Sequence, residues 1–441
     1  MISWLIEFSA RNRFLVLAIV GVLAAFGWWS LKTAPLDALP DLSDTQVIIY
    51  SKWEQSPDII EDQVTYPIIT ALLGAPKVRA VRGISDFGVS YVYVIFEDGT
   101  DLYWARTRTL EYLSGVLAKL PQGVQTQLGP DATGLGWIFQ YTLVDENGKH
   151  NLAQLRSLQD WYLRFQLQSV PGVAEVASIG GFVRQYQIEL DPNKLRAYNV
   201  PLDKVVEAVR NGNQDVGGRL VEMSGAEYMV RGRGYARSTA DLGDIALAAS
   251  PTGVPVKVRD VGRVTLGPDL RRGVADLDGR GDAPGGIVVV RQGENALNVI
   301  ERVKAKLEAL QAGLPKGVKV VTTYDRSELI LRSIDTLKHT LIEELIVVSL
   351  VILIFLWHIP SALVPMLTLP LAVLIAFIPI RAMGVTTNIM SLGGIAIAIG
   401  ALVDAAIVVV EQTHKRLEEW ERNGRQGDSR DVIVSAVKEV G

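Results

Sequence analysis

The sequence predicts a membrane protein of the α-helical plus α+β class, with four transmembrane helices and a large outer segment of two ferredoxin-like βαββαβ repeats. Three observations support this fold class. Four stretches are apolar enough to cross a bilayer, about 300 residues between the first two carry strand and helix patterns, and those patterns occur twice. A small subdomain is expected to interrupt the second repeat.

The four apolar stretches approach the ~20 residues that a transmembrane helix needs. They are Phe14–Leu31, Leu341–Trp357, Ala362–Ile380 and Ile389–Val410. The first is longer than the ~7–15-residue apolar core of a signal peptide, and Pro35 follows Ala34 where cleavage would be sought. We therefore predict a membrane anchor and not a cleaved signal.

Basic residues near the ends of the spans predict the orientation, because cytoplasmic ends carry an excess of lysine and arginine. Arg11 and Arg13 precede the first span. Those that follow the fourth span are Lys415, Arg416, Arg422 and Arg425. Four crossings return the chain to its starting side, so both groups are expected in the cytoplasm. Residues 32–340 would then lie on the other face, which is the periplasm in a bacterium.

The first repeat of the outer segment begins with a β-branched stretch, "TQVIIYSKW". A helix is expected to start at Ser56 and Pro57, which suit its first positions, and to end at Gly74. Two strands ("KVRAVRGI" and "VSYVYVIFEDG"), a helix ("DLYWARTRTLEYLSGVLAKL") and a strand ("GVQTQLGP") follow. The order βαββαβ is the split βαβ pattern of ferredoxin-like folds.

A shift of 95 residues superposes this repeat on a second one, with Pro76 on Pro171 and Ile84 on Ile179. The junction "LPQGV" also returns later as "LPKGV". The region 191–272 interrupts the second copy and contains the glycine-rich "NGNQDVGGRLVEMSGAEYMVRGRGY". That stretch is either a mobile surface loop or an arm that reaches a neighbouring subunit.

The composition excludes several classes of function. The net charge is −4 with no basic block, so nothing indicates nucleic-acid binding. The chain has no cysteine, which excludes disulfides, thiolate metal sites and cysteine catalysis. No phosphate loop, nucleophile elbow or dinucleotide motif is present. We therefore expect neither an enzyme nor a resident cofactor.

Asp404 is the strongest site candidate because it lies inside the fourth apolar stretch. An ionised aspartate at a helix centre costs ~2.5–3.5 kcal/mol on insertion scales, and such carboxylates usually mark ion or proton pathways. The alternative is a packing pair with a buried cation. Glu411 lies two helical turns later on nearly the same face, either as a second proton-binding group or as a solvated helix end.

Small residues precede Asp404, among them Gly393, Gly394 and Gly400. They permit close approach by another transmembrane helix, which would cover the carboxylate. We expect that helix to lie outside this chain. The cores of the four spans contain no lysine or arginine, so a cationic partner for Asp404 must also come from elsewhere.

The chain resembles the resistance–nodulation–division (RND) transporters throughout its length. Three motifs look like the heavy-metal efflux branch of that family: "PLDALPDLSDTQVII", "GISDFGVSYVYVIFEDGTD" and "SLGGIAIAIGALVDAAIVVVE". Drug exporters typically carry two adjacent aspartates in the fourth span, where this chain has Ala405 after Asp404. The cobalt/zinc/cadmium group carries a further acid six positions earlier, where this chain has Ala398. The motif is most like that of the Cus-type copper/silver exporters.

The resemblance implies a proton-driven metal antiporter in the bacterial inner membrane. It implies a homotrimer that works with a periplasmic adaptor and an outer-membrane channel. Asp404 would be the proton relay and Glu411 a helper. Family members are about twice as long, so this chain corresponds to the N-terminal half. The missing C-terminal half would hold the main metal site and the basic partner of Asp404.

The cargo that the resemblance favours is Cu(I) or Ag(I), carried as substrate. Copper/silver members have methionines in the fourth span; Met390 matches one of them, whereas Leu402 and Val409 replace two others. Zinc, cobalt or cadmium export by the same fold is the alternative. A non-transporting scaffold is a third interpretation.

The patterns predict seven regions, and the resemblance implies the porter and docking roles given to them here. They are 1–31, the N-terminal helix and first span; 32–133, the first porter subdomain; 134–190 and 273–335, the two parts of the second porter subdomain; 191–272, the docking subdomain; 336–413, spans two to four; and 414–441, a cytoplasmic amphipathic segment before an expected fifth span.

Overall fold

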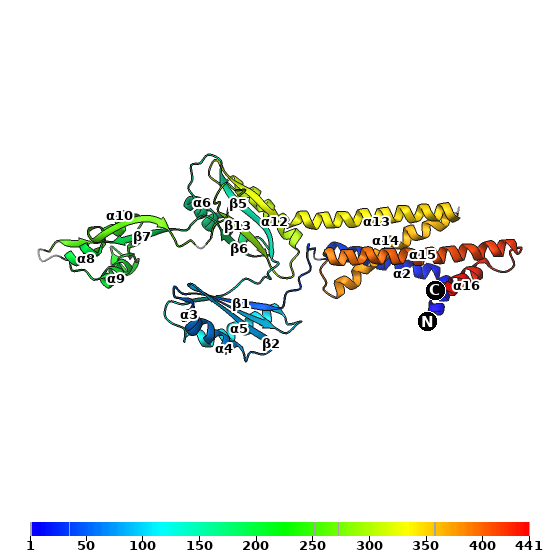
Figure 1. Cartoon of the computed structure of the whole chain (residues 1–441), viewed down its shortest axis with the longest axis horizontal. Helices are drawn as coiled ribbons and strands as arrows, with labels where there is room; N and C mark the ends of the chain where they lie inside the picture. The colour runs from blue at the N-terminus through cyan, green and yellow to red at the C-terminus, as the bar shows by residue number, and fades with distance from the viewer. Residues whose placement is uncertain (1, 35, 250–252, 272, 357–358, 441) are drawn as a thin grey trace.

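The computed structural model describes residues 2–34, 36–249, 253–271, 273–356 and 359–440. The molecule is elongated (Figure 1). Long helices form one end, two β-sheets with their helices form the middle, and a narrow extension forms the other end. Both termini lie at the helical end.

The first sheet is antiparallel, with strand order β2-β3-β1-β4. Its elements are β1 (Gln46–Lys52), α3 (Pro57–Ile60), the π-helical turn η1 (Glu61–Thr65), α4 (Tyr66–Leu72), β2 (Val78–Asp86), β3 (Val89–Phe96), α5 (Leu102–Leu117) and β4 (Gln125–Leu128). Alternate residues of β1, Val47 and Ile49, are buried under the helices with Val92 and Val94 of β3. This period of two is the pattern of a sheet with one covered face.

The second sheet has the order β14-β5-β13-β6, again antiparallel. Its elements are β5 (Trp137–Asp145), α6 (Leu152–Leu158), the π-helical turn η2 (Gln159–Leu163), α7 (Arg164–Gln168), β6 (Val173–Ile179), β13 (Gly285–Val290), α12 (Ala296–Gln311) and β14 (Val318–Asp325). In each sheet the first strand pairs with the third and the fourth. Val78 begins β2 and Val173 begins β6, and both strands are sheet edges.

The extension runs out from β7 and returns along β12. Its elements are β7 (Arg184–Leu190), α8 (Pro192–Ala197), α9 (Leu202–Gly212), β8 (Val216–Met223), β9 (Ala226–Gly232), α10 (Thr239–Gly243), β10 (Ala246–Ala249), β11 (Pro255–Lys257), α11 (Val258–Val261) and β12 (Gly262–Pro268). A small core of its own includes Val200, Val205 and Val258. The glycine-rich stretch forms the β8–β9 hairpin, which is exposed along its whole length.

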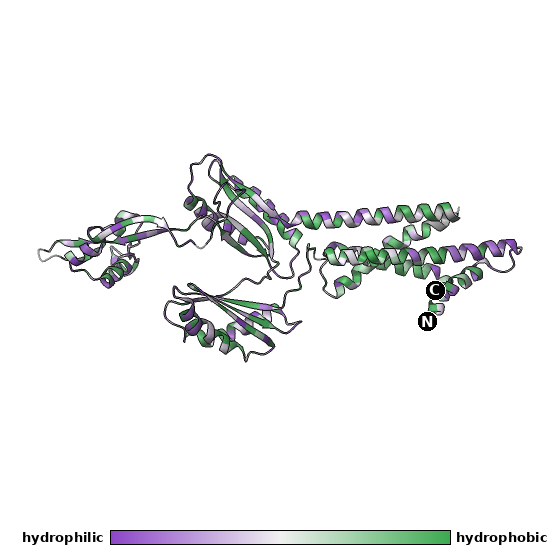
Figure 2. Cartoon of the chain, viewed as in Figure 1, coloured by the Kyte–Doolittle hydropathy of each residue, from purple (hydrophilic) through white to green (hydrophobic). Residues whose placement is uncertain are grey.

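The helical end contains α1 (Ile2–Arg11), α2 (Arg13–Thr33), α13 (Arg326–Leu356), α14 (Ile359–Ala382), α15 (Ile389–Arg422) and α16 (Ser429–Val440). Within the described ranges, three helices are long and apolar enough to cross a membrane: α2, Leu363–Ala382 within α14, and α15. Figure 2 shows them largely hydrophobic, with hydrophilic residues at the C-terminal end of α15. The predicted span Leu341–Trp357 follows α13 as far as Leu356; Trp357 lies outside the described residues.

Arg326, the first residue of α13, joins the helices to the second sheet. Its guanidinium donates to the carbonyl oxygens of Leu135 at 2.6 Å and Trp137 at 2.7 Å. It also lies 3.4 Å from the carboxylate of Asp37, in the segment after α2. Because Arg326 is only 5% exposed, these contacts fix the start of α13 against two other segments.

Candidate functional site

Asn388 fixes the N-terminus of α15, the helix that carries all the predicted site residues. Its side-chain oxygen accepts the N–H groups of Met390 and Ser391, both at 3.0 Å. The hydroxyl of Ser391 accepts the N–H of Asn388 at 2.8 Å. Such reciprocal capping satisfies N–H groups that a helix start otherwise leaves free. Met390 therefore lies in the first turn, with its side chain exposed.

One face of α15 packs against the neighbouring helices. Its buried residues are Leu392, Ile395, Ile399, Val403 and Val410. Their spacing of three, four and seven residues makes a single stripe on the helix. The stripe packs with Leu369 and Phe377 of α14.

Asp404 and Glu411 lie on a second face of α15, beside the buried stripe. Glu411 lies 18 residues, or five helical turns, after Gly393, and Gly400 and Asp404 fall between them on the same side. Both carboxyl-bearing side chains are exposed, and neither forms a hydrogen bond or ion pair with a residue that the structure describes. The site therefore presents two carboxylates without a counter-ion in the described part of the chain.

The glycines of α15 leave open space beside the helix. A Cβ atom built at Gly393 or Gly400 would have no heavy atom within 4 Å. The same holds for Gly394, which lies on the opposite flank of the buried stripe. The described helices therefore do not cover the face that carries Asp404.

A groove opens between α13 and α15 near their N-terminal ends. Ser333, Thr336 and Thr340 line it from α13, and Leu392, Gly393 and Ala396 line it from α15. The two threonine hydroxyls donate to carbonyl oxygens of their own helix, which leaves their oxygen lone pairs available as acceptors. Gly393 lines this groove and lies on the same face of α15 as Asp404, so the groove opens on that face.

Glu344 on α13 was not among the predicted site residues. Its Oε2 atom is buried and has no hydrogen-bond partner within the described part of the chain. The signal was present in the sequence, since "LIEELIVV" places two acids in a predicted span. Glu344 is therefore a further carboxylate inside a predicted span, on a helix that contacts α15.

Gly27 on α2 marks the closest helix approach among the glycines of the predicted spans. A Cβ atom there would lie 2.3 Å from the carbonyl oxygen of Leu374 on α14. A Cβ atom at Gly21, six residues earlier on the same helix, would have no neighbour within 4 Å. Sequence alone could not separate the two, because both are glycines in the same apolar run.

Comparisons with known proteins identify the family. Residues 5–441 match the AcrB/AcrD/AcrF family. The chain is 55% identical to the putative cation efflux system protein SilA of Salmonella typhimurium and 54% identical to the cation efflux system protein CusA of Escherichia coli (strain K12). Each alignment covers 100% of this chain and 43% of the relative. The cobalt-zinc-cadmium resistance protein CzcA of Cupriavidus metallidurans is 36% identical over 96% of this chain and 40% of its own length.

A crystal structure of a heavy metal efflux pump also matches, with a TM-score of 0.85 and 35% identity over 99% of this chain and 43% of that one. The chain thus spans less than half the length of the curated relatives that it matches. The predicted RND fold and the predicted kinship with heavy-metal efflux proteins are confirmed by these matches. The chain belongs to the AcrB/AcrD/AcrF family.

Proposed function

We propose that the chain is the N-terminal half of a proton-driven heavy-metal efflux pump, with Asp404 as the proton-binding group. One observation carries the proposal: a carboxylate on a long apolar helix has no counter-ion in the described part of the chain and lies on an open, glycine-bearing face. A carboxylate inside a membrane span without a fixed partner is costly, so a functional role is the best physical reason to keep it. Protonation would remove that cost and deprotonation would restore it.

Glu411 on α15 and Glu344 on α13 are further candidate proton-binding groups in the helical region. Glu411 shares the face of Asp404 and lies near the polar end of α15, where it would exchange protons with the cytoplasm. The groove at Ser333, Thr336 and Thr340 lies toward the opposite end of the same face. A proton taken up from the periplasmic side would meet hydroxyl groups there before it reaches the carboxylates. A basic residue of the missing C-terminal half would neutralise Asp404 when it is ionised.

The proposed topology has four membrane spans in the inner membrane, the second of them α13. The basic residues at both ends of the helical region favour a cytoplasmic location for α1 and α16. Residues 32–340 would be periplasmic. Their two sheets share one strand order, which supports two ferredoxin-like repeats, divided at the boundaries given from the sequence.

The proposed assembly is a homotrimer that works with a periplasmic adaptor and an outer-membrane channel. The exposed β8–β9 hairpin supports a docking role for the region 191–272, because a two-stranded hairpin rarely stands alone in water. Its apolar side chains, such as Val216 and Tyr228, would be covered by a neighbouring subunit.

The proposed cargo is Cu(I) or Ag(I). Identity of 54–55% to the SilA and CusA cation efflux proteins, against 36% to the cobalt-zinc-cadmium resistance protein, supports this choice. The absence of an acid at Ala398 agrees with it. Zinc or cobalt is the second candidate, favoured by Leu402 and Val409, which offer no thioether for a soft metal.

The decisive experiment replaces Asp404 by asparagine in the complete pump and measures metal resistance of the cells. We expect Asp404→Asn to abolish resistance, because the amide cannot bind and release a proton. The matched control is Asp98→Asn, whose side chain is exposed in the outer segment. Resistance at the wild-type level in Asp404→Asn would overturn the relay role. Vesicle transport compared for silver, copper and zinc would identify the cargo.

A further inference from the structure

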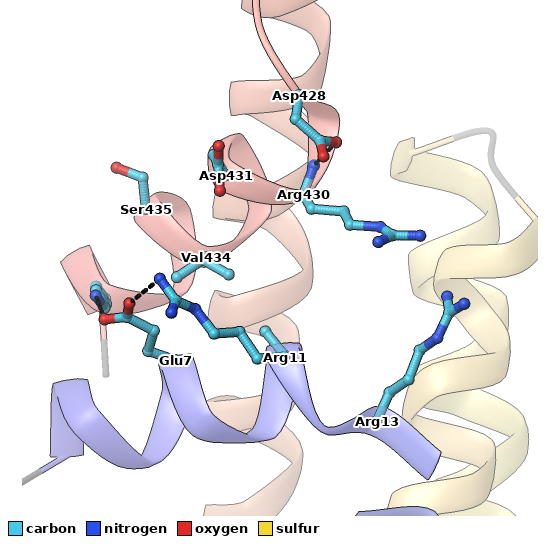
Figure 3. A pocket seen from close by; sticks show the side chains of 10 residues that line it. Glu7, Arg11, Arg13, Asp428, Arg430, Asp431, Val434 and Ser435 are labelled. Carbon is cyan, nitrogen blue, oxygen red and sulfur yellow. Dashed lines mark hydrogen bonds and ion pairs between the residues drawn. The ribbon is translucent and has the colours of Figure 1, made fainter.

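Helices α1 and α16 enclose a pocket at the end of the molecule where both termini lie (Figure 3). Its charged lining includes Glu7, Arg11, Arg13, Asp428, Arg430 and Lys438. These residues come from opposite ends of the sequence, and the ion pair of Lys438 with Glu7, at 2.9 Å, holds the two helices together. The pocket is therefore a feature of the folded chain and not of one helix.

The carboxylate of Glu7 has two cationic partners within the pocket, Lys438 and Arg11. The ammonium of Lys438 donates a hydrogen bond to it and, with the charge of Arg11 2.8 Å away, lowers the pKa of the Glu7 carboxyl. Asp428 accepts the N–H of Arg430 at 3.0 Å and so caps the start of α16. Asp431 lies in the first turn of α16, where a carboxylate is favoured by the helix dipole. Glu7 thus pairs with cations, and Asp428 and Asp431 stabilise the start of α16. Asp428 and Asp431 also reduce the positive charge of the pocket.

Arg13 and Arg430 have no carboxylate partner among the residues that the structure describes. Figure 3 shows their guanidinium groups on the same side of the pocket, away from the Glu7–Arg11 pair. Arg13 lies over the ring of Phe14, with 5.1 Å between the guanidinium carbon and the ring centroid. Two guanidinium groups from separate helices thus line one pocket, and neither forms an ion pair with a residue that the structure describes.

The surroundings of the pocket indicate the depth at which it would lie in a membrane. α1 exposes the apolar side chains of Ile2, Trp4 and Leu5, and Phe14 is 76% exposed at the start of α2. A short helix with an exposed apolar face and basic residues beside it is typical of helices that lie in the membrane interface. The two arginines would then stand at the level of the lipid headgroups.

We propose that Arg13 and Arg430 together bind the phosphate of an anionic phospholipid headgroup in the cytoplasmic leaflet. The planar guanidinium matches phosphate oxygens with paired N–H groups, which a lysine does not. The lipid would bridge the start of α2 and the start of α16 and hold this end of the helical region against the bilayer. This inference rests on the membrane orientation given under the proposed function.

The test compares lipid retention by the chain in nanodiscs of phosphatidylglycerol and of phosphatidylcholine. We expect tight retention of phosphatidylglycerol, and binding about thirtyfold weaker in the double variant Arg13→Gln/Arg430→Gln, which corresponds to about 2 kcal/mol at about 1.4 kcal/mol per tenfold. The matched control, Arg422→Gln/Arg425→Gln, removes the same charge on the same side of the membrane and should retain the lipid. Equal loss in both variants, or no loss in either, would overturn the proposal.

Two further measurements separate the alternatives. Inorganic phosphate that displaces the lipid at millimolar concentration would show a free-anion site and would overturn the lipid assignment. Because the chain has no cysteine, a single Gln426→Cys label reports the side of the membrane on which this end lies. Labelling from the periplasm would overturn the proposed orientation, whereas cytoplasmic labelling with unchanged lipid retention in Arg13→Gln/Arg430→Gln would overturn the lipid site alone.

Discussion

The guanidinium of Arg326 lies 3.4 Å from the carboxylate of Asp37, although the two residues are 289 positions apart in the chain. Asp37 follows α2, and Arg326 begins α13. The same guanidinium holds two carbonyl oxygens at the entrance to β5. A movement of α13 would therefore be transmitted directly to the second sheet. Under the proposed function, this contact would connect the membrane helices to the outer segment.

Arg326→Met should lower the stability of the chain by about 3 kcal/mol. The substitution removes the cationic partner of the partly buried Asp37 carboxylate and the guanidinium donor of two carbonyl oxygens, and each loss of this kind costs about 1–3 kcal/mol. The measurement is the thermal unfolding midpoint in detergent, followed by tryptophan fluorescence. Arg332→Met, at an exposed position on the same helix, should shift it little. A midpoint for Arg326→Met equal to that of the control would show that these contacts do not stabilise the start of α13.

Gly27→Ala should destabilise the helical region, because its Cβ would lie 2.3 Å from the carbonyl oxygen of Leu374. Overpacking of this kind costs about 1–3 kcal/mol. Gly21→Ala is the control on the same helix, with no heavy atom within 4 Å of the added carbon, and should be neutral or slightly stabilising. The same unfolding assay distinguishes them. If both variants behave alike, α2 and α14 do not approach as closely as described.

Much of the fold could be predicted from the sequence, because strands and apolar helices leave periodic patterns. The stretch "TQVIIYSKW" contains β1, and the fourth apolar run contains most of the membrane part of α15. The π-helical turns η1 and η2 were not predicted, because a single i→i+5 turn shifts the spacing of buried residues too little to be recognised in a short amphipathic stretch. The Arg326–Asp37 contact could not be predicted from the sequence either, because it depends on the tertiary packing of two distant segments.

Part of the candidate site could likewise be predicted from the sequence, and part required the structure. Asp404 and Glu411 could be found because charge inside an apolar run is rare. Glu344 could have been found by the same rule. The difference in packing between Gly27, where an added Cβ atom would collide with α14, and Gly400, where it would meet no heavy atom within 4 Å, required coordinates.

The second sheet should lose stability at acid pH through Asp145. Burial alone would raise the pKa of this carboxyl, but hydrogen bonds from the backbone and ring of His150 and from the N–H groups of Asn147 and Lys149 lower it to about 2. Its ordinary value is 3.8. Because the pKa is lower in the folded chain, the ionised Asp145 carboxyl stabilises the fold fully above about pH 4. Protonation removes that stabilisation as the pH falls toward 2.

Acid unfolding monitored by circular dichroism tests this prediction. Asp145→Asn should flatten the decline in stability between about pH 4 and pH 2. Asp98→Asn, whose side chain is 87% exposed, should leave the decline unchanged. An identical pH profile for the wild type and Asp145→Asn would show that the hydrogen bonds to this carboxyl do not stabilise the fold.

Gly400→Leu tests whether a helix of the missing half covers the face that carries Asp404. In the present chain the substitution should leave the unfolding midpoint unchanged, because the added side chain meets open space among the described residues. In the complete pump it should reduce metal resistance strongly, since a bulky side chain would separate two helices that small residues allow to pack closely. Ala398→Leu, at an exposed position on the opposite flank of the same helix, is the control and should have the smaller effect. Full resistance with Gly400→Leu would mean that this face stays open to lipid or water, and that the counter-ion of Asp404 does not arrive on a helix packed beside Gly400.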